Sequence, residues 1–392
     1  MAMQTGAGGA RGERPIDWTL LKFLAFPLLS LVVLVEVALG GDFLWLVFPS
    51  YLLVAFAGDE VLGDDFAMGS RARARVLDAY LYSALPLALG VTALFAIHAG
   101  GAPAWVSNAF AAVGVDIDAR VALTDGWDLA VGAFGIGTFY GTLVNVAHEL
   151  IHRTGDRPAW LTGRWLLAHT LDTGFAIEHV HGHHRHIGTD RDPASARRGE
   201  YVLAFAWRST VGQARGAFEH EAERLTRRGL PVWSRHNVFL RGQAMSTALI
   251  VAVGLLGGWA AIAAFLVTAV LGKLYLELIN YVEHYGLARI EGTRVRPHHS
   301  WNCHNRMSSW VLFNLPRHSD HHMFAGRPYY DLRPVPDLAG DAPVLPMGYL
   351  GSIMVALVPR WWNRMMEPRL ADWDARLASV DEVEAAKRRA VR

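Results

Sequence analysis

The sequence predicts an all-α membrane protein with about six transmembrane helices and a cytoplasmic, histidine-rich cap that binds metal. Three observations support this fold class. Apolar runs close to membrane-spanning length recur along the 392 residues. Arginines gather in alternate connections between those runs. Ten histidines fall into four short clusters at helix-turn spacing, and each cluster lies at the cytoplasmic end of a run or in a cytoplasmic segment.

Composition narrows the function classes. The chain is 52% hydrophobic because it contains long apolar runs. A formal net charge of +1 gives no reason to expect nucleic acid as a partner. The single cysteine, Cys303, excludes a disulfide framework and any iron–sulfur or rubredoxin-type site that needs four cysteines. If the protein carries out redox chemistry, its electrons must therefore come from another protein.

We predict six membrane spans from the apolar runs. They lie near residues 20–39, 43–57, 79–98, 129–147, 238–256 and 259–281. The second run is short, so its flanks must tilt or extend to the interface. The fifth has Arg241 and Gln243 near its start and several glycines near its end. For either run, a helical hairpin that only dips into the membrane is the alternative.

A single membrane domain is expected over residues 17–370. Residues 1–16 are Gly-rich and polar and are expected to be disordered, whereas 371–392 is expected to form a charged, solvated cytoplasmic tail. An amphipathic helix is predicted over Gly212–Arg228. The short apolar stretch Tyr349–Val358 is expected to form a helix at the membrane interface.

The basic residues predict the orientation of the chain. Arg11 and Arg14 precede the first run, many arginines lie between Arg153 and Arg241, and the segment after the sixth run is also basic. By the positive-inside rule, both termini and every histidine cluster are cytoplasmic. A metal site at that boundary, above apolar helices, suits a substrate that enters from the bilayer.

The first histidine cluster is His148-Glu149-Leu150-Ile151-His152, at the end of the fourth run. Its two histidines share a helix face with Asn145. Alone this pattern is ambiguous, because His-Glu-x-x-His is also the zinc-protease signature, in which the glutamate is the general base. Two polar residues can also simply cap a span.

The second and third clusters are more specific. The ligand candidates of the second are His179, His183 and His184. His181 and His186 also fit by spacing, so this stretch does not decide which histidines bind a metal. The alternative is a solvated, histidine-rich surface loop that binds none. The third cluster repeats the pattern around Asp320, and its candidates are His318, His321 and His322.

The fourth cluster depends on a polar stripe along an apolar helix. Glu277, Asn280 and His284 recur on one face of the sixth run, and buried ionisable groups in a membrane usually mark function.

Side chains that can orient ligating imidazoles from an outer shell are Glu149, Glu178, Glu277, Asn280, Glu283 and Asp320. Histidines without comparable spacing are left out of the ligand set, among them His98, His169, His220, His236, His298, His299 and His304.

Together these motifs, over roughly residues 40–370, resemble the integral-membrane alkane 1-monooxygenase family. More distantly they resemble membrane xylene monooxygenases and fatty-acid desaturases. His148–Arg153 looks like the first histidine box of that family, and Glu178–His184 with the following Asp192–Ser195 is similar to the second. Asn280–Gly286 resembles an additional His-Tyr-Gly box, and Arg317–His322 looks like the third box.

The resemblance implies a non-haem diiron centre held by nine imidazoles. Carried over residue by residue, these belong to His148, His152, His179, His183, His184, His284, His318, His321 and His322. It also implies O2 as co-substrate, and electrons from NAD(P)H through a rubredoxin reductase and a rubredoxin. The expected reaction is hydroxylation of a terminal methyl C–H of an alkane to a primary alcohol, in a bacterial-type inner (plasma) membrane.

One departure leaves the substrate open. The alkane enzymes typically carry Leu-Gln before the Arg-His-Ser of the third box, and this chain has Leu315-Pro316. The stretch Arg208–Trp233 also looks like xylene monooxygenases, so the alkyl side chain of an aromatic ring is an alternative substrate.

Residues expected to line the substrate channel are Tyr51, Thr138, Thr142 and Asn145. Arginines expected to receive an acidic rubredoxin include Arg197, Arg198 and Arg306.

Three rival functions remain at this stage. A fatty-acyl desaturase would use similar boxes but would remove two hydrogens. An intramembrane zinc protease would use His148, Glu149 and His152 alone and leave the other histidines unexplained. A metal carrier would place its ligands near mid-membrane along a path, whereas these histidines gather at one face.

Overall fold

The computed structural model describes residues 19–69 and 71–391, so the predicted disordered segment 1–16 lies outside the described residues. Within the described part the chain is helical, with two isolated β-bridges and no strand. Five helical segments are long and apolar enough to cross a membrane: Thr19–Leu39, Gly41–Leu62, Arg71–Gly100, Gly126–His152 and Val238–His284. The predicted class, an all-α membrane protein, is confirmed.

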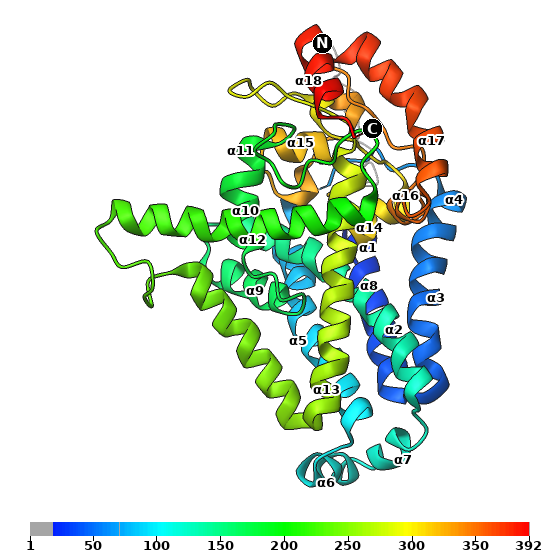
Figure 1. Ribbon diagram of the computed structural model, residues 1–392. Coiled ribbons are helices and arrows are strands. Elements are labelled where there is room, and N and C mark those ends of the chain that lie inside the picture. Colours follow the sequence, from blue (N-terminus) through cyan, green and yellow to red (C-terminus); the bar gives the residue numbers. More distant parts are fainter. Residues whose placement is uncertain (1–18, 70, 392) are drawn as a thin grey trace, which may run out of the picture.

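The last of these segments is a hairpin. Helix α13 (Val238–His284) bends sharply at Gly257 and Gly258, where Gly258 has φ +65°, and Figure 1 shows its two arms diverging from this point. A Cβ on Gly257 would lie 2.2 Å from the Ala96 carbonyl oxygen, so a side chain cannot fit there. The two arms correspond to the fifth and sixth predicted runs, and the count of six membrane crossings stays a prediction.

The second segment corrects the boundaries expected from hydropathy. A continuous helical rod runs from η1 (Gly41–Leu46) through α3 (Val47–Tyr51) and η2 (Leu52–Ala57) to α4 (Gly58–Leu62). It is therefore 22 residues long rather than the short run predicted over 43–57. The extension was missed because Asp59 looks like the end of an apolar run. Its carboxylate is instead buried and accepts hydrogen bonds from the Ser308 amide and hydroxyl.

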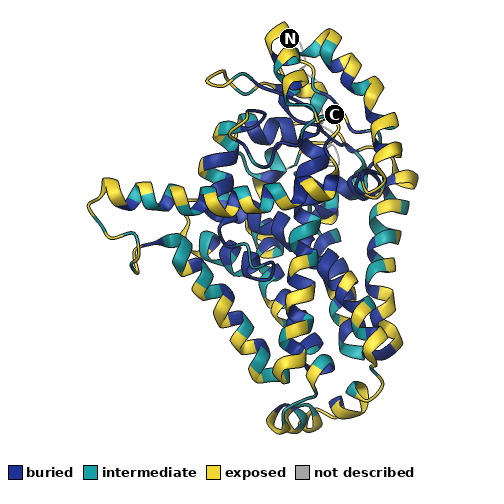
Figure 2. Cartoon of the chain, viewed as in Figure 1, coloured by how far each residue is buried: buried dark blue, intermediate teal, exposed yellow. Residues whose placement is uncertain are grey.

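Close packing of two helices places the site. Helices α8 (Gly126–His152) and α13 approach closely because Gly137 and Gly141 face Leu271 and Tyr275; a Cβ on Gly141 would lie 2.2 Å from the Tyr275 ring. Both helices are buried where they near the cap, as the dark blue ribbon in Figure 2 shows. His148 near the end of α8 and His284 at the end of α13 therefore lie inside the protein.

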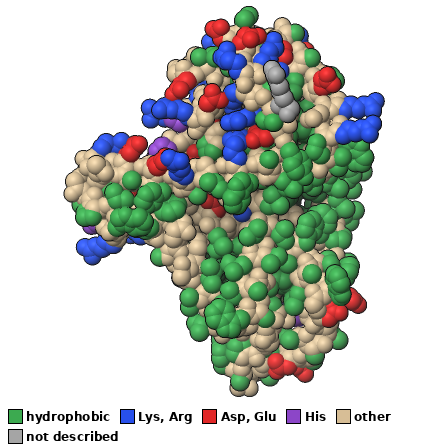
Figure 3. All heavy atoms as spheres, in the orientation of Figure 1, with side chains coloured by type: hydrophobic (Ala, Val, Ile, Leu, Met, Phe, Trp, Pro, Cys, Tyr) green, Lys and Arg blue, Asp and Glu red, His purple; other side chains and the backbone are tan. Residues whose placement is uncertain are grey.

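The surface shows a membrane-like division. A broad apolar band covers the middle and lower part of the molecule in Figure 3, and lysines and arginines gather at the upper end. The histidine-bearing elements α10 (Phe175–Glu178), α11 (His184–His186) and α15 (His318–Met323) lie towards this basic end. The opposite end carries α6 (Ala104–Ala112) and α7 (Ile117–Val121).

Helix α12 (Val202–Arg227) begins ten residues before the predicted Gly212–Arg228, since the apolar turn with Leu203 and Trp207 is helical too. The other helices are α1 (Thr19–Phe23), α2 (Ala25–Leu39), η3 (Arg71–Arg73), α5 (Ala74–Gly100), α9 (Arg157–Ala168), η4 (His179–His183), η5 (Pro297–His299), α14 (Arg306–Val311), η6 (Tyr329–Asp331) and η7 (Val335–Asp337).

The C-terminal elements pack more closely than the sequence predicts. Helix α16 (Tyr349–Ala356), predicted at the interface, is mostly buried and packs against α13. It is followed by α17 (Pro359–Asp372), η8 (Trp373–Leu377) and α18 (Val380–Arg389). The tail predicted to be solvated is in fact anchored, because Asp374 pairs with Arg198 and Glu382 with His299.

Candidate metal centre

Four separate pieces of chain deliver histidines to one place. Helix α8 ends with His148 and His152, and α13 ends with His284. The π-helical turn η4 and the short α11 supply the second cluster, and α15 supplies the third. Because the first two histidines are one turn apart on α8, both imidazoles face the same side.

The nine predicted histidines form two adjacent groups. The first group is His148, His152, His179, His184 and His321, and the second is His183, His284, His318 and His322. Within each group the candidate ligand atoms all lie within 4.8 Å of one another. The rings of His184 and His322 are 4.5 Å apart between centroids, so the two groups are in contact. The structure thus brings together every histidine of the predicted set.

The separations between nitrogens in these groups suit the binding of a shared cation. Pairs of Nε2 atoms lie 3.2 Å apart for His148 and His152, 3.1 Å for His179 and His184, and 2.9 Å for His318 and His322. Two nitrogens bound at right angles to one ion about 2.1 Å away would be about 3 Å apart. The Nε2 atom of His183 is buried without a hydrogen-bond partner among the described residues. The residues present therefore fit two metal ions.

The imidazoles of the cap are held neutral, as metal ligation requires. Burial lowers the pKa of His179, His184 and His321 far below the ordinary value, and the neighbouring imidazoles lower it further. The same two causes act in the same order on the pKa of His318 and His322. Each group can therefore offer several uncharged nitrogen donors to a cation.

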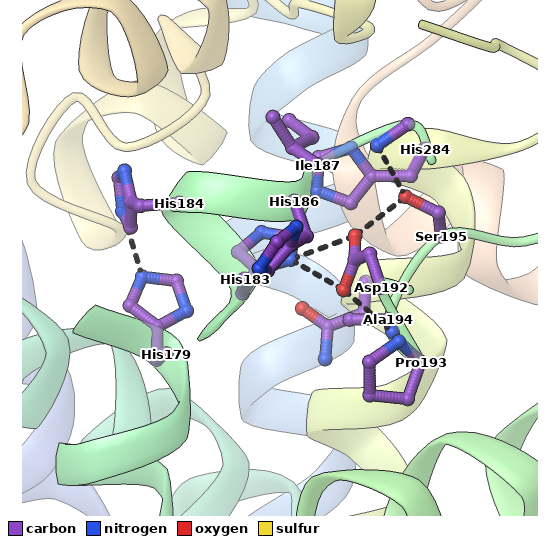
Figure 4. A network of polar contacts seen from close by, with 12 residues as sticks. His179, His183, His184, His186, Ile187, Asp192, Pro193, Ala194, Ser195 and His284 are labelled. Atoms are coloured by element: carbon purple, nitrogen blue, oxygen red, sulfur yellow. Dashed lines mark hydrogen bonds and ion pairs between the residues drawn. The ribbon is translucent and has the colours of Figure 1, made fainter. Parts of the chain in front are cut away.

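A carboxylate outside the predicted set orients one ligand candidate. The Nδ1 atom of His183 lies 3.0 Å from Asp192, whose other hydrogen bonds come from the Ser195 hydroxyl and the Ala194 amide (Figure 4). Burial alone would raise the pKa of Asp192, but its interaction with His183 and its hydrogen bonds from Ser195 and Ala194 hold it below its usual value. This bond directs Nε2 of His183 into its group. The Asp192–Ser195 motif was a visible signal, yet nothing in the spacing assigned Asp192 this contact.

The predicted outer-shell residues are dispersed. Glu283 reaches the second group, 3.3 Å from Nε2 of His318, and accepts a hydrogen bond from the Tyr349 hydroxyl. Glu149 pairs with Arg153, and Asp320 pairs with Arg327. Glu277 binds Lys273 and Gln213 and lies 3.4 Å from the Asn280 amide nitrogen. Glu178 is buried, and burial raises its pKa.

A narrow cavity adjoins the metal groups from the membrane side. It is lined by the apolar Val144, Phe175, Leu276 and Ile279, and by His148, His179 and His318. Asn145 also lines it, and its role in a substrate channel stays a prediction. Its volume is about 20 Å³, which is room for about one water molecule and too little for an alkyl chain. An entering chain must therefore displace side chains.

Of the other predicted channel residues, Thr138 and Thr142 precede Asn145 on α8, and Tyr51 is the last residue of α3. The Thr142 hydroxyl donates to the Tyr51 hydroxyl at 3.3 Å and lies 2.8 Å from the Thr138 carbonyl oxygen. All three side chains are buried, although they are not among the cavity-lining residues. They lie on the membrane side of Asn145, where a continuation of the passage would run.

A third group of candidate ligands, His298, His299 and Glu382, lies outside the centre. His299 Nδ1 accepts the Arg296 amide at 3.0 Å, so Nε2 carries the proton and donates to Glu382 at 2.7 Å. Nε2 of His298 lies 3.3 Å from the same Glu382 carboxylate. His181 is exposed and His186 half-buried, and neither belongs to a ligand group.

Comparison with known proteins assigns the chain to a family. The fatty acid desaturase family model matches residues 125–351, which is more than half of the chain and includes every histidine box. The chain belongs to the fatty acid desaturase family.

Within that family the chain resembles monooxygenases. It is 40% identical over 251 residues to alkane 1-monooxygenase 1 of Pseudomonas aeruginosa and 38% identical over 240 residues to alkane 1-monooxygenase of Acinetobacter baylyi. These alignments cover 62% and 60% of this chain and 63% and 58% of those relatives. The hydroxylase component XylM of the Pseudomonas putida xylene/toluene monooxygenase is 27% identical over 370 residues, 93% of each chain. The resemblance predicted from the histidine boxes is thereby confirmed.

Proposed function

We propose that this protein hydroxylates a terminal methyl C–H of an alkane to a primary alcohol, with O2 as oxidant. The observation that carries this proposal is the position of the apolar cavity, whose lining includes His148, His179 and His318 from both imidazole groups. A hydrocarbon that reached this cavity from the bilayer would bring its end to the metal-binding nitrogens. The likeness to alkane 1-monooxygenases supports the same reaction.

The two groups would each hold one iron ion, with His148, His152, His179, His184 and His321 as one ligand set and His183, His284, His318 and His322 as the other. When bound, the irons supply the activation of O2 for C–H oxidation. Imidazoles are neutral ligands, so nearby carboxylates have to offset the metal charge. Asp192 does this through His183, and Glu283 lies 3.3 Å from His318.

The protein's own side chains account for positioning. A hydrocarbon end that entered this cavity would contact the apolar side chains of Val144, Phe175 and Leu276 beside His148. Asn145 of α8 also lines the cavity, and both of its amide atoms are buried without a hydrogen-bond partner among the described residues. Its amide can therefore form a hydrogen bond to the hydroxyl group that the proposed reaction adds to the substrate.

Electrons would come from NAD(P)H through a rubredoxin reductase and a rubredoxin. The single cysteine leaves this chain without a cysteine-ligated redox centre of its own. Of the arginines expected to bind the rubredoxin, Arg198 forms its contacts within this chain: it pairs with Asp374 and donates a hydrogen bond to the Gly286 carbonyl. The basic end would face the cytoplasm of a bacterial-type inner (plasma) membrane, with both termini on that side.

A second candidate substrate is an alkyl side chain on an aromatic ring. The likeness to XylM supports it, because that alignment runs over nearly the whole chain. Desaturation is the third possibility within the family. The protease reading is disfavoured, because Glu149 pairs with Arg153 and does not line the cavity.

A product assay tests the proposal. Membranes that contain the protein are supplied with NADH, reductase, rubredoxin and 18O2, and are offered octane, hexadecane or a xylene. We expect an 18O-labelled primary alcohol from an alkane. Labelled benzylic alcohol alone would move the protein to the xylene branch, and an alkene product would identify a desaturase.

A further inference from the structure

The C-terminal segment contacts the chain on both sides of the four-imidazole group. We name residues 370–391 the C-terminal clasp. Near its end, Arg389 donates a hydrogen bond to the Gly188 carbonyl, and its Nε atom lies 3.1 Å from Asp190. The Arg389 side chain is only 9% exposed, although it lies in the last turn of a charged helix. An arginine buried this deeply is held for a specific contact.

From Gly188 a continuous series of hydrogen bonds leads to a proposed metal ligand. The Gly188 amide donates to the Ser195 hydroxyl at 2.8 Å, and this hydroxyl donates to Asp192 at 2.5 Å. Asp192 in turn lies 3.0 Å from Nδ1 of His183 (Figure 4). Gly188 has φ +74°, and a Cβ there would lie 3.1 Å from Arg289, so this turn has little freedom to rearrange.

The clasp also contacts the turn after a second proposed ligand. Asp374 holds both terminal nitrogens of Arg198, whose Nε donates to the Gly286 carbonyl, two residues after His284. Leu370 packs against Gly286, where a Cβ would lie 2.8 Å from its side chain. His183 and His284 belong to the same group of four imidazoles.

The clasp has anchors of its own. Ser379 and Glu382 form a capping box that starts α18, and Glu382 accepts the His299 hydrogen bond at 2.7 Å. The Val391 amide donates to the Arg198 carbonyl at 2.8 Å. These contacts fix the helix so that the position of Arg389 is defined.

We propose that Arg389 is a positioning residue for His183: it holds the Gly188 turn, and through Ser195 and Asp192 it sets the direction of the imidazole in the four-imidazole group. The inference rests on the metal centre of the proposed function. Removal of an outer-shell partner of a metal ligand typically costs ten- to a hundredfold in metal affinity or activity. The effect of Arg389 should fall in the lower part of that range and be confined to one of the two metals.

The test measures metal release from the purified full chain in detergent after loading with Fe2+ alone under anaerobic conditions. In Arg389→Ala, one of the two irons should leave about tenfold faster, and one of the two Mössbauer signals should change. Arg389→Lys keeps the charge and should recover part of the loss. Arg388→Ala, at the exposed neighbouring position, is the matched control and should release iron like the unmodified protein.

A double-mutant cycle separates positioning from general loosening. If Arg389 acts through Asp192, the variant with both Arg389→Ala and Asp192→Asn should release iron no faster than Asp192→Asn alone. Independent effects that multiply, or faster release of both irons together, would overturn the proposal. So would unchanged release in Arg389→Ala. If the unmodified chain holds no iron, the metal centre itself is rejected. If the unmodified chain binds iron normally but does not hydroxylate any of the substrates, only the proposed reaction is rejected.

Discussion

The ammonium group of Lys273 lies 2.6 Å from the Glu277 carboxylate, one turn away on α13; the Glu277 side chain is fully buried and that of Lys273 is 12% exposed. Asp172 completes the triad at 2.5 Å from the same ammonium. Gln213 of α12 donates to Glu277 at 2.9 Å. The triad and Gln213 therefore connect three separate segments next to the α10–η4 turn that carries the second histidine box.

We expect Lys273→Met to destabilise the protein strongly, because it leaves the buried Glu277 carboxylate and the mostly buried Asp172 carboxylate without their cation. Breaking a buried pair in this way typically costs about 3–5 kcal/mol. The measurement is thermal unfolding in detergent, with Lys387→Met on exposed α18 as the matched control. Equal unfolding temperatures for the two variants would show that the triad contributes nothing to stability.

Replacing Tyr51 by alanine should lengthen the preferred alkane. Tyr51 is buried and lies against α8 through its contact with Thr142, so its ring can limit the depth of a passage that ends at Asn145. One methylene in an apolar pocket is worth about tenfold or more in selectivity. The ratio of hexadecanol to octanol from mixed substrates measures the effect. Tyr51→Phe keeps the bulk and should keep the profile; an unchanged ratio in Tyr51→Ala removes Tyr51 from the channel.

The stability of the α12–α13 connection should depend on pH through Glu221. Burial alone would raise the pKa of Glu221, but hydrogen bonds from Arg224 and from the Val238 amide hold it below the ordinary 4.5. A lowered folded-state pKa means that the stabilisation is fully present above about pH 4.5 and is lost as the pH falls through the folded value.

Glu221→Gln should therefore unfold more easily than the unmodified protein at pH 7, by about 1–2 kcal/mol. This difference should shrink as unfolding is measured at successively lower pH below 4.5. Glu219→Gln, on the exposed side of the same helix, serves as control. A difference that is constant from pH 7 to pH 3 would contradict the assignment.

Local patterns predicted much of this centre. The i, i+4 spacing of His148 and His152 needs only one helix to bring the imidazoles together, and long apolar runs predict spans without any tertiary information. Which of His179, His181, His183 and His184 bind a metal could not be predicted in this way, because their directions depend on the π-helical turn η4. Spacing alone left that choice open, and the resemblance to a family made it.

Contacts between distant segments were not visible in the sequence. Asp59 looked like the end of a span, because its partner Ser308 lies 249 positions away. The charged tail looked solvated, because Glu382 and Arg389 find their partners at His299 and Gly188, 83 and 201 positions away. Such pairs depend on tertiary packing, and no helical periodicity reports them.

The most direct test of the central claim is the iron bound per chain after anaerobic loading with Fe2+, measured for alanine variants of one histidine from each group. Relative to the unmodified protein, His321→Ala and His322→Ala should each lose about one iron, because each removes a ligand from a different group. His181→Ala, which lies between the ligands of the second box but outside both groups, should lose none. Full iron content in His321→Ala and His322→Ala, or equal loss in His181→Ala, would contradict the two-group centre.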